Sequence, residues 1–293
     1  MFLLQQLING VMLGGVYGVA AVGFALVWGV MNEINIAHAA FMVIGAYTSF
    51  FLFTTLHVDP LASIVVAMAV AFALAYPIQR YLLNRALPHG LVITLATTFG
   101  LNLFLENVVR RVFSSDYRSI SPSYITTSFS LGPLTLPLVP LLVFVLAVAF
   151  TAGLHLFLER SSLGLAIRAT ALNRVAARIV GIPVQVVYAF TFALGAALAA
   201  ASGTMIGTLQ SIYPGMGDAF LTKVFVITAL GGFGSIPGAL VGSLILSLVE
   251  VLSATYLSPN IVDFVAFSLL VVVLVVRPQG LFGKRFYGEE ASA

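Results

Sequence analysis

The sequence predicts an all-α, polytopic integral membrane protein with about eight or nine transmembrane helices. Of its 293 residues, 60% are hydrophobic and only 8% are charged. A water-soluble domain carries roughly 25% charged residues, because water must wet its surface. So few charges cannot cover a chain of this length in water, and most of its exterior must therefore face lipid.

Nine apolar runs, separated by short polar breaks, supply the predicted helices. A full crossing takes about 20 apolar residues. The runs occupy residues 6–31, 36–56, 60–80, 91–110, 137–158, 184–206, 219–233, 238–257 and 260–276. The run 219–233 is short and contains Lys223, so it could be a re-entrant or broken segment. No linker rich in proline, serine or charge divides the chain, and we interpret residues 1–293 as one membrane domain.

Basic residues indicate the cytoplasmic loops, because such loops collect Lys and Arg. Three groups qualify: Arg80 and Arg85; Arg160, Arg168, Arg174 and Arg178; and Arg277, Lys284 and Arg285. Placing all three inside puts the segment 112–136 outside and the carboxyl terminus in the cytoplasm. The amino terminus is then outside if all nine runs cross, and inside if one does not. Arg110, Arg111 and Arg118 violate the rule, and they could cap a helix end and face an extracytoplasmic partner.

The composition excludes several functional classes. There is no cysteine, hence no disulfide, no thiolate metal site and no cysteine nucleophile. The net charge is +3, but the arginines are dispersed between apolar runs, so we expect no nucleic-acid partner. The phosphate-binding pattern G-x-x-x-x-G-K with a following Ser or Thr is absent, and no serine has plausible His and Asp partners. We therefore expect no catalysis, no metal and no cofactor in this chain.

Small residues recur four apart in two places. Gly10, Gly14 and Gly18 form one set, and Gly234, Gly238 and Gly242 form the other. This spacing places each set on one helix face, where helix backbones approach closely in lipid. The pattern predicts helix packing and says nothing about substrate.

Two polar or glycine-rich breaks interrupt apolar sequence, at residues 31–38 and 231–238. Glycine and proline weaken helices, and proline also removes a backbone donor. Transporters place interrupted helices at corresponding positions of two structural repeats, with the freed backbone lining the pathway. No convincing repeat exists at the level of residues, so a pair of loops at the membrane surface is the alternative.

Polar side chains inside the spans are candidates for a translocation pathway, because isolated polar groups are costly in lipid. The leading candidates are Glu33, Asn35, His38, Asn102 and Glu106, followed by Asn107, Lys223, Glu250 and Asp263. Structural pairing at helix interfaces is the alternative for each of them. His38 could equally be a packing histidine, since no second His or carboxylate lies at metal-ligand spacing.

The segment 161–183, between the fifth and sixth runs, predicts a short amphipathic helix of about four turns. Leu165, Leu172, Ala176 and Ile179 fall on one stripe, whereas Arg174 and Arg178 share another face. Gly181 and Pro183 predict its end. The helix could lie on anionic lipid, dock into a groove of a partner protein, or simply connect two spans.

Residues 175–181, Val-Ala-Ala-Arg-Ile-Val-Gly, resemble the EAA-x-x-x-G loop of ABC-importer permeases. The chain as a whole is similar to the branched-chain amino-acid permeases of the LivH type. The similarity rests on residues 36–39 with 45–47, 167–170 with Asn173, Gly181 with Ile182, 231–238, and 277–283. Two positions depart from the family pattern. Ala39 replaces the glycine that follows the family's His, and Val175 replaces the Glu of the loop.

The resemblance implies a type II-like ABC-importer permease in the bacterial inner membrane. It implies a coupling helix at about 164–181 that sits in a groove of an ATPase subunit, through Arg168, Asn173, Arg174, Ala176, Ala177, Arg178 and Gly181. The implied partners are a second, LivM-like permease, two ATP-binding subunits that hold the ATP, and an extracytoplasmic solute-binding protein. The implied cargo is branched-chain amino acids. Urea or short amides, or a stand-alone secondary transporter or channel, are the alternatives.

Overall fold

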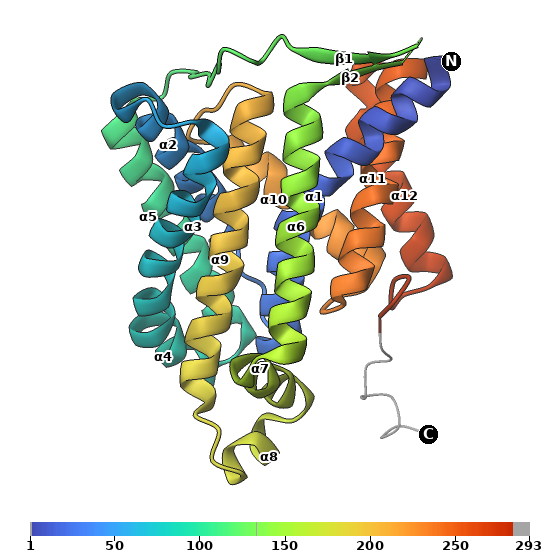
Figure 1. Ribbon diagram of the computed structural model, residues 1–293. Coiled ribbons are helices and arrows are strands. Elements are labelled where there is room, and N and C mark those ends of the chain that lie inside the picture. Colours follow the sequence, from blue (N-terminus) through green and yellow to red (C-terminus); the bar gives the residue numbers. More distant parts are fainter. Residues whose placement is uncertain (1, 133, 284–293) are drawn as a thin grey trace.

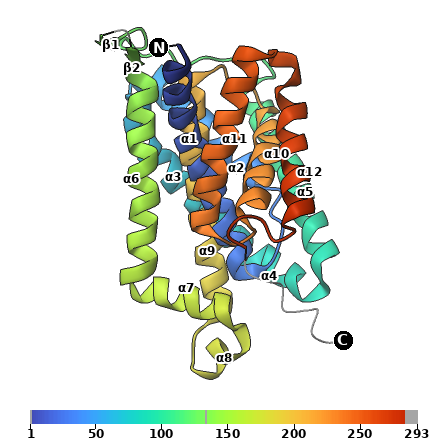
Figure 2. The ribbon, with the colours of Figure 1, turned by 90° about the vertical axis from the view of Figure 1, so that its right-hand side faces the viewer.

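The computed structural model describes residues 2–132 and 134–283, most of which form helices that run along one axis (Figures 1 and 2). Eight helical stretches in this part of the chain are long and apolar enough to cross a membrane. The longer helices are α1 (Phe2–Met31), α2 (His38–Leu56), α3 (Pro60–Pro77), α5 (Leu91–Phe113), α6 (Leu138–Arg160), α9 (Val184–Leu209), α10 (Met216–Gly231), α11 (Ile236–Tyr256) and α12 (Val262–Val276). The prediction of eight or nine transmembrane helices is confirmed.

Shorter elements connect these helices. A π-helical turn (Ile78–Leu83), α4 (Asn84–Ala86) and a 3₁₀ turn (Leu87–His89) join α3 to α5, whereas α7 (Ser162–Leu172) and α8 (Arg174–Ile179) join α6 to α9. A 3₁₀ turn at Pro259–Ile261 precedes α12. The strands β1 (Ser128–Leu131) and β2 (Leu134–Pro137) form an antiparallel hairpin, which the sequence analysis did not predict.

The core of the bundle is built around α1 and α9. In the most apolar 18-residue stretch of α1, 83% of the residues are buried, against 6% for the last span. Helix α1 packs against α11, α9 and α6, while α9 packs against α3 and α2. Both core helices are rich in Gly and Ala. Small residues let helix backbones approach closely, which stabilises a bundle in lipid where hydrophobic burial gives little advantage.

The two ends of the bundle differ in charge. One end holds the β-hairpin and the start of α1, and we call it the hairpin end (Figure 1). The other holds α4, α7 and α8 and the end of α12, and we call it the basic end. The basic end carries Arg80, Arg85, Arg160, Arg168, Arg174, Arg178 and Arg277. Arg110 and Arg118 lie at the hairpin end, where they pair with Glu106 and Asp116. Lys284 and Arg285 lie outside the described residues.

The run predicted at 219–233 forms α10, which has only 16 residues. At 1.5 Å per residue it is about 24 Å long, too short to span a bilayer alone. An extended segment precedes it, and Ile212 in that segment exchanges backbone hydrogen bonds of 2.8 and 2.9 Å with Arg118. The segment and α10 together make a ninth passage, so α1 begins and α12 ends at opposite ends of the bundle (Figure 1).

The glycine spacing identified two helix contacts. Gly10, Gly14 and Gly18 all face α11, as predicted for a packing seam. Gly238 and Gly242 face α10. The prediction that Gly234 shares their helix face was wrong. Gly234 lies in the turn before α11 with φ of 77°, a left-handed conformation that glycine adopts without strain.

The tightest crossing joins α2 to α9 at Gly203. A Cβ atom on Gly203 would collide with the carbonyl oxygen of Met42, which is backbone and cannot rotate away. By contrast, a Cβ atom on Gly153 in α6 would meet nothing within 4 Å.

We therefore predict opposite effects for two identical substitutions. Gly203→Ala should lower stability by about 1–3 kcal/mol, because the overpacked crossing must separate. Gly153→Ala should be neutral or slightly stabilising, since alanine favours helix over glycine by about 0.5–1 kcal/mol. Thermal unfolding of the purified variants in detergent measures both. Equal midpoints for the two variants would show that the α2–α9 crossing is not tightly packed.

Candidate functional site

The first break brings the start of α2 into the interior of the bundle. His38, the first residue of α2, places Nε2 3.0 Å from the carbonyl oxygen of Ala20 in α1. Ala20 precedes the end of α1 by about three turns, or roughly 16 Å. Residues 32–37 therefore turn back along α1, and Asn35 and Ala37 are buried. The second half of this break is therefore an interior feature, whereas Asn32 and Glu33 remain at the basic end.

The start of α2 is capped by a side chain from another helix. Ala37 at the N-cap position has no side-chain acceptor. Asn102 of α5 supplies one, since its Oδ1 accepts a 3.0 Å hydrogen bond from the backbone N–H of Ala40. The Asn102 amide also donates to Asp218, in the first turn of α10, over 3.4 Å. Asn102 thus satisfies one of the free N–H groups that every helix start leaves.

The starts of α2 and α10 consequently lie side by side. Besides the Asn102–Asp218 link, a Cβ on Gly217 of α10 would meet the carbonyl oxygen of Ala39 in α2. The N-terminus of each helix carries partial positive charge, and the Asp218 carboxylate offsets part of it. The sequence analysis missed Asp218. An acidic residue next to a short apolar run was the available signal, because acidic residues are favoured in a first helical turn.

Asn35 and His38 keep polar atoms without partners. Both side-chain atoms of the Asn35 amide are buried and unpaired, and so is Nδ1 of His38. Because the Ala20 carbonyl can only accept, Nε2 of His38 is the donor and Nδ1 is left as an acceptor. Unpaired polar atoms are costly in an apolar interior, so this group beside two helix starts is a candidate functional site.

The remaining two pathway candidates lie apart from this group. Glu106 is one turn nearer the hairpin end of α5 and forms an ion pair with Arg110. Glu33 follows α1 and faces the basic end. The structure therefore brings together Asn35, His38 and Asn102, and it separates Glu33 and Glu106 from them.

A second polar cluster joins α1, α10 and α11. Lys223 Nζ lies 2.9 Å from Glu250 Oε2 and 3.0 Å from the Tyr17 hydroxyl, which in turn donates to Glu250 over 3.0 Å. The Glu250 side chain is 6% exposed and that of Lys223 is 25% exposed. Lys223 and Glu250 were recognised from the sequence as polar residues in apolar runs, but their partnership was not. A closed triad of this kind fixes the short helix α10 against its neighbours.

The predicted coupling helix at 164–181 is two helices, so the prediction of one continuous element was wrong. Asn173 separates α7 from α8 with an extended backbone. Its Oδ1 accepts hydrogen bonds from the N–H groups of Val175 and Ala176, at 2.9 and 3.0 Å. An asparagine that caps the following turn ends the preceding helix, which periodicity alone does not reveal. Gly181, with φ of 88°, ends the element as predicted.

The predicted stripe of Leu165, Leu172, Ala176 and Ile179 is exposed, and other apolar side chains of this segment point outward with it. Leu172, Val175, Ile179 and Val180 are 61–81% exposed. Ala177 is buried, whereas Arg168 and Arg178 are exposed. Helix α8 projects beyond the rest of the bundle at the basic end (Figures 1 and 2). A projecting element with an exposed apolar surface is typical of a docking site for another protein.

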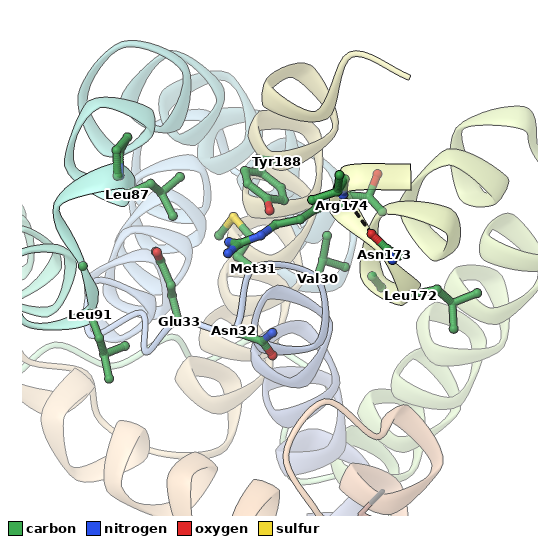
Figure 3. A pocket seen from close by; sticks show the side chains of 15 residues that line it. Val30, Met31, Asn32, Glu33, Leu87, Leu91, Leu172, Asn173, Arg174 and Tyr188 are labelled. Atoms are coloured by element: carbon green, nitrogen blue, oxygen red, sulfur yellow. Dashed lines mark hydrogen bonds between the residues drawn. The ribbon is translucent and has the colours of Figure 1, made fainter. Parts of the chain in front are cut away.

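Arg174 differs from the other arginines of this segment. It extends from the start of α8 past Met31 toward Glu33, and both line a cavity of about 670 Å³ (Figure 3). Partial burial raises the pKa of Glu33 to about 7, although the Thr94 hydroxyl and the Arg174 charge act in the opposite direction. Glu33 lies in the connection 32–37, outside the helices that span the membrane.

Comparison with known proteins identifies relatives along almost the whole chain. The family model described as "Branched-chain amino acid transport system / permease component" matches residues 6–274. The high-affinity branched-chain amino acid transport system permease protein BraD of Pseudomonas aeruginosa is 34% identical, over 96% of both chains. The LivH protein of Escherichia coli is 33% identical, over 97% of this chain and 96% of its own.

Two more distant proteins are also similar to this chain over most of its length. A probable branched-chain amino acid transport permease protein LivH of Methanocaldococcus jannaschii is 24% identical over 90% of this chain and 87% of its own. Among solved structures, PsaBC from Streptococcus pneumoniae in complex with Fab aligns with 92% of this chain and 91% of that chain, at 12% identity and a TM-score of 0.49.

We predict that the stability of the protein depends strongly on the ion pair between Lys223 and Glu250. Lys223→Met leaves the Glu250 charge buried without its cation, and it should lower stability by roughly 3–5 kcal/mol. The double variant Lys223→Met with Glu250→Leu removes both charges and should recover most of that loss. Thermal unfolding in detergent distinguishes the variants. If the double variant were as unstable as the sum of the two single variants, the pair would not be coupled.

The pKa of Glu33 predicts a pH dependence of stability. Because its folded-state pKa exceeds the usual value of 4.5, the folded protein holds the proton more tightly than the unfolded chain. The contribution of protonated Glu33 to the free energy of unfolding is fully present below pH 4.5 and is lost as the pH rises through about 7. Glu33→Gln cannot ionise, so its unfolding midpoint should fall less than that of the unmodified protein between pH 5 and 8. Parallel curves would contradict the prediction.

Proposed function

Because this chain belongs to the family of branched-chain amino acid transport system permease components, we propose that it is the membrane subunit of an ATP-driven importer for branched-chain amino acids. The match over residues 6–274 carries this proposal. Leucine, isoleucine and valine are the expected cargo, and the bacterial inner membrane is the expected location. The basic end faces the cytoplasm in this proposal, in keeping with the preference of arginines for that side.

The projecting segment α7–α8 is the proposed contact with an ATP-binding subunit. Its support is the exposed apolar surface of Leu172, Val175, Ile179 and Val180, flanked by Arg168 and Arg178. Apolar side chains at a membrane–water boundary are stabilised when a partner groove covers them. Asn173 caps the start of α8, Ala176 and Ala177 lie within α8, and Gly181 follows its end. Val175 adds apolar surface where the loop motif has a Glu, so the contact proposed here is mainly hydrophobic.

The interior group beside the starts of α2 and α10 is the proposed translocation pathway. Asn35, His38 and Asn102 supply the hydrogen-bonding groups, and Glu106 lies on the hairpin side of them. A second permease subunit would complete the pathway, and an extracytoplasmic solute-binding protein would deliver the cargo at the hairpin end. ATP is bound and hydrolysed by the ATP-binding subunits in this proposal, so the chain itself carries no catalytic site.

Reconstitution tests the proposal directly. Proteoliposomes that contain this chain, its neighbouring permease and ATPase subunits and the solute-binding protein should take up radiolabelled leucine only when ATP is supplied. Omission of the ATPase subunits should abolish uptake. Uptake by this chain alone, driven by an ion gradient, would instead establish a stand-alone transporter.

The docking surface generates a sharper prediction. Ile179→Asp places a charge on the most exposed apolar residue of α8, and it should weaken ATPase association at least ten-fold and reduce uptake in parallel. The matched control is Ile125→Asp, which makes the same change at the hairpin end, where Ile125 is 41% exposed. Co-purification measures association. Equal retention of the ATPase by the two variants would refute the docking role of α8.

A further inference from the structure

The cavity at the basic end combines two opposite charges with several apolar side chains. Glu33 and Arg174 reach it from the α1–α2 connection and from the start of α8 (Figure 3). Val30, Met31, Leu87 and Tyr188 supply apolar surface around them (Figure 3). The volume of about 670 Å³ is ample for a single amino acid and falls in the range of small-molecule sites.

The two charged groups face each other without forming an ion pair. Among the ion pairs of residues 2–132 and 134–283, none joins Glu33 to Arg174. Arg174 is nevertheless near enough to oppose the rise in the pKa of Glu33. A carboxylate and a guanidinium held apart in this way leave room for a molecule that carries both a cation and an anion.

We propose that this cavity binds a free zwitterionic amino acid with a branched apolar side chain, at the exit side of the permease. The Glu33 carboxylate accepts hydrogen bonds from the ligand's ammonium group, and the Arg174 guanidinium donates to its carboxylate. Charge-assisted hydrogen bonds of this type are the strong ones in proteins. Both the choice of amino acid and the exit-side position rest on the proposed function.

The apolar side chains of the lining set the expected preference for the ligand's side chain. Val30 and Met31 come from the end of α1 and Leu87 from the connection between α3 and α5, and together they favour an aliphatic side chain over a polar one. Arg174 is also the first residue of α8, the segment proposed to contact the ATPase. A bound amino acid that contacts Arg174 would therefore influence the position of α8, so this position would depend on the concentration of transported amino acid at the basic end.

Equilibrium binding to the purified full-length chain in nanodiscs tests the site, without ATP, ATPase or solute-binding protein. The probes are leucine, 3-methylbutylamine, which lacks the carboxylate, and 4-methylpentanoate, which lacks the amine. At about pH 8, where Glu33 is largely ionised, leucine should bind roughly ten-fold or more tightly than either analogue. Equal binding of all three, or no saturable binding of leucine, overturns the proposal.

Two variants test which residue binds which charged group of the ligand. Arg174→Gln should weaken leucine and 4-methylpentanoate about ten-fold or more and leave 3-methylbutylamine unchanged. Glu33→Gln should weaken leucine and 3-methylbutylamine and leave 4-methylpentanoate unchanged. A folding defect would weaken all three probes together. The matched controls, Arg85→Gln and Glu159→Gln, remove exposed charges at the same end of the bundle and should bind leucine normally. Loss of binding in these controls overturns the assignment.

The result separates this site from the proposed function. ATP-dependent leucine uptake by the reconstituted complex, with no leucine binding to the isolated chain, overturns the cavity site and leaves the importer standing. Leucine binding that follows the charge pattern above, with no ATP-dependent uptake, supports the cavity site and contradicts the importer.

Discussion

The hydrogen bonds of the Asn102 amide hold together the part of the bundle where helices begin inside the membrane. Water is absent from the hydrocarbon core, so a helix that starts there needs protein partners for its free N–H groups. Asn102 provides one for α2 and reaches Asp218 in α10 with the same side chain. A single amide on α5 thereby sets the relative position of two interrupted helices, and the polar interior is organised around it.

The same constraint explains the contrast between the two ends of α10. Its start is reached by Asn102, whereas its end is closed by backbone N–H groups of Leu281 and Phe282, which donate to Leu230 and Gly231. The triad of Lys223, Glu250 and Tyr17 fixes its middle. A helix too short to cross the bilayer alone is thus held by polar contacts along its length, and these contacts come from α1, α5, α11 and the chain after α12.

The spans could be predicted from sequence because runs such as 137–158 and 260–276 are governed by apolar length alone. How far the break at residues 31–38 reaches into the bundle could not be predicted from sequence. It depends on the contact between His38 and the carbonyl of Ala20 in another helix. The coupling segment is divided into α7 and α8 because Asn173 caps the first turn of α8 and does not continue α7. The periodicity of the apolar residues fits one continuous helix as well as two, so it could not predict this division. Partners such as Lys223 and Glu250 were visible as polar residues, but their pairing is a property of the tertiary fold. The roles of the coupling and pathway residues stay predictions.

The position of α1 at the centre of the bundle has a consequence for how the protein is made. Chains enter the membrane in order of synthesis, and domains form from the amino-terminal side first. Helix α1 is therefore inserted while α9 and α11, its main neighbours, are still absent. Until they arrive, its glycine seam has no α11 to pack against, and Tyr17 has neither Lys223 nor Glu250 to bond. Helix α1 therefore reaches its final environment only after helices near the other end of the chain have been inserted.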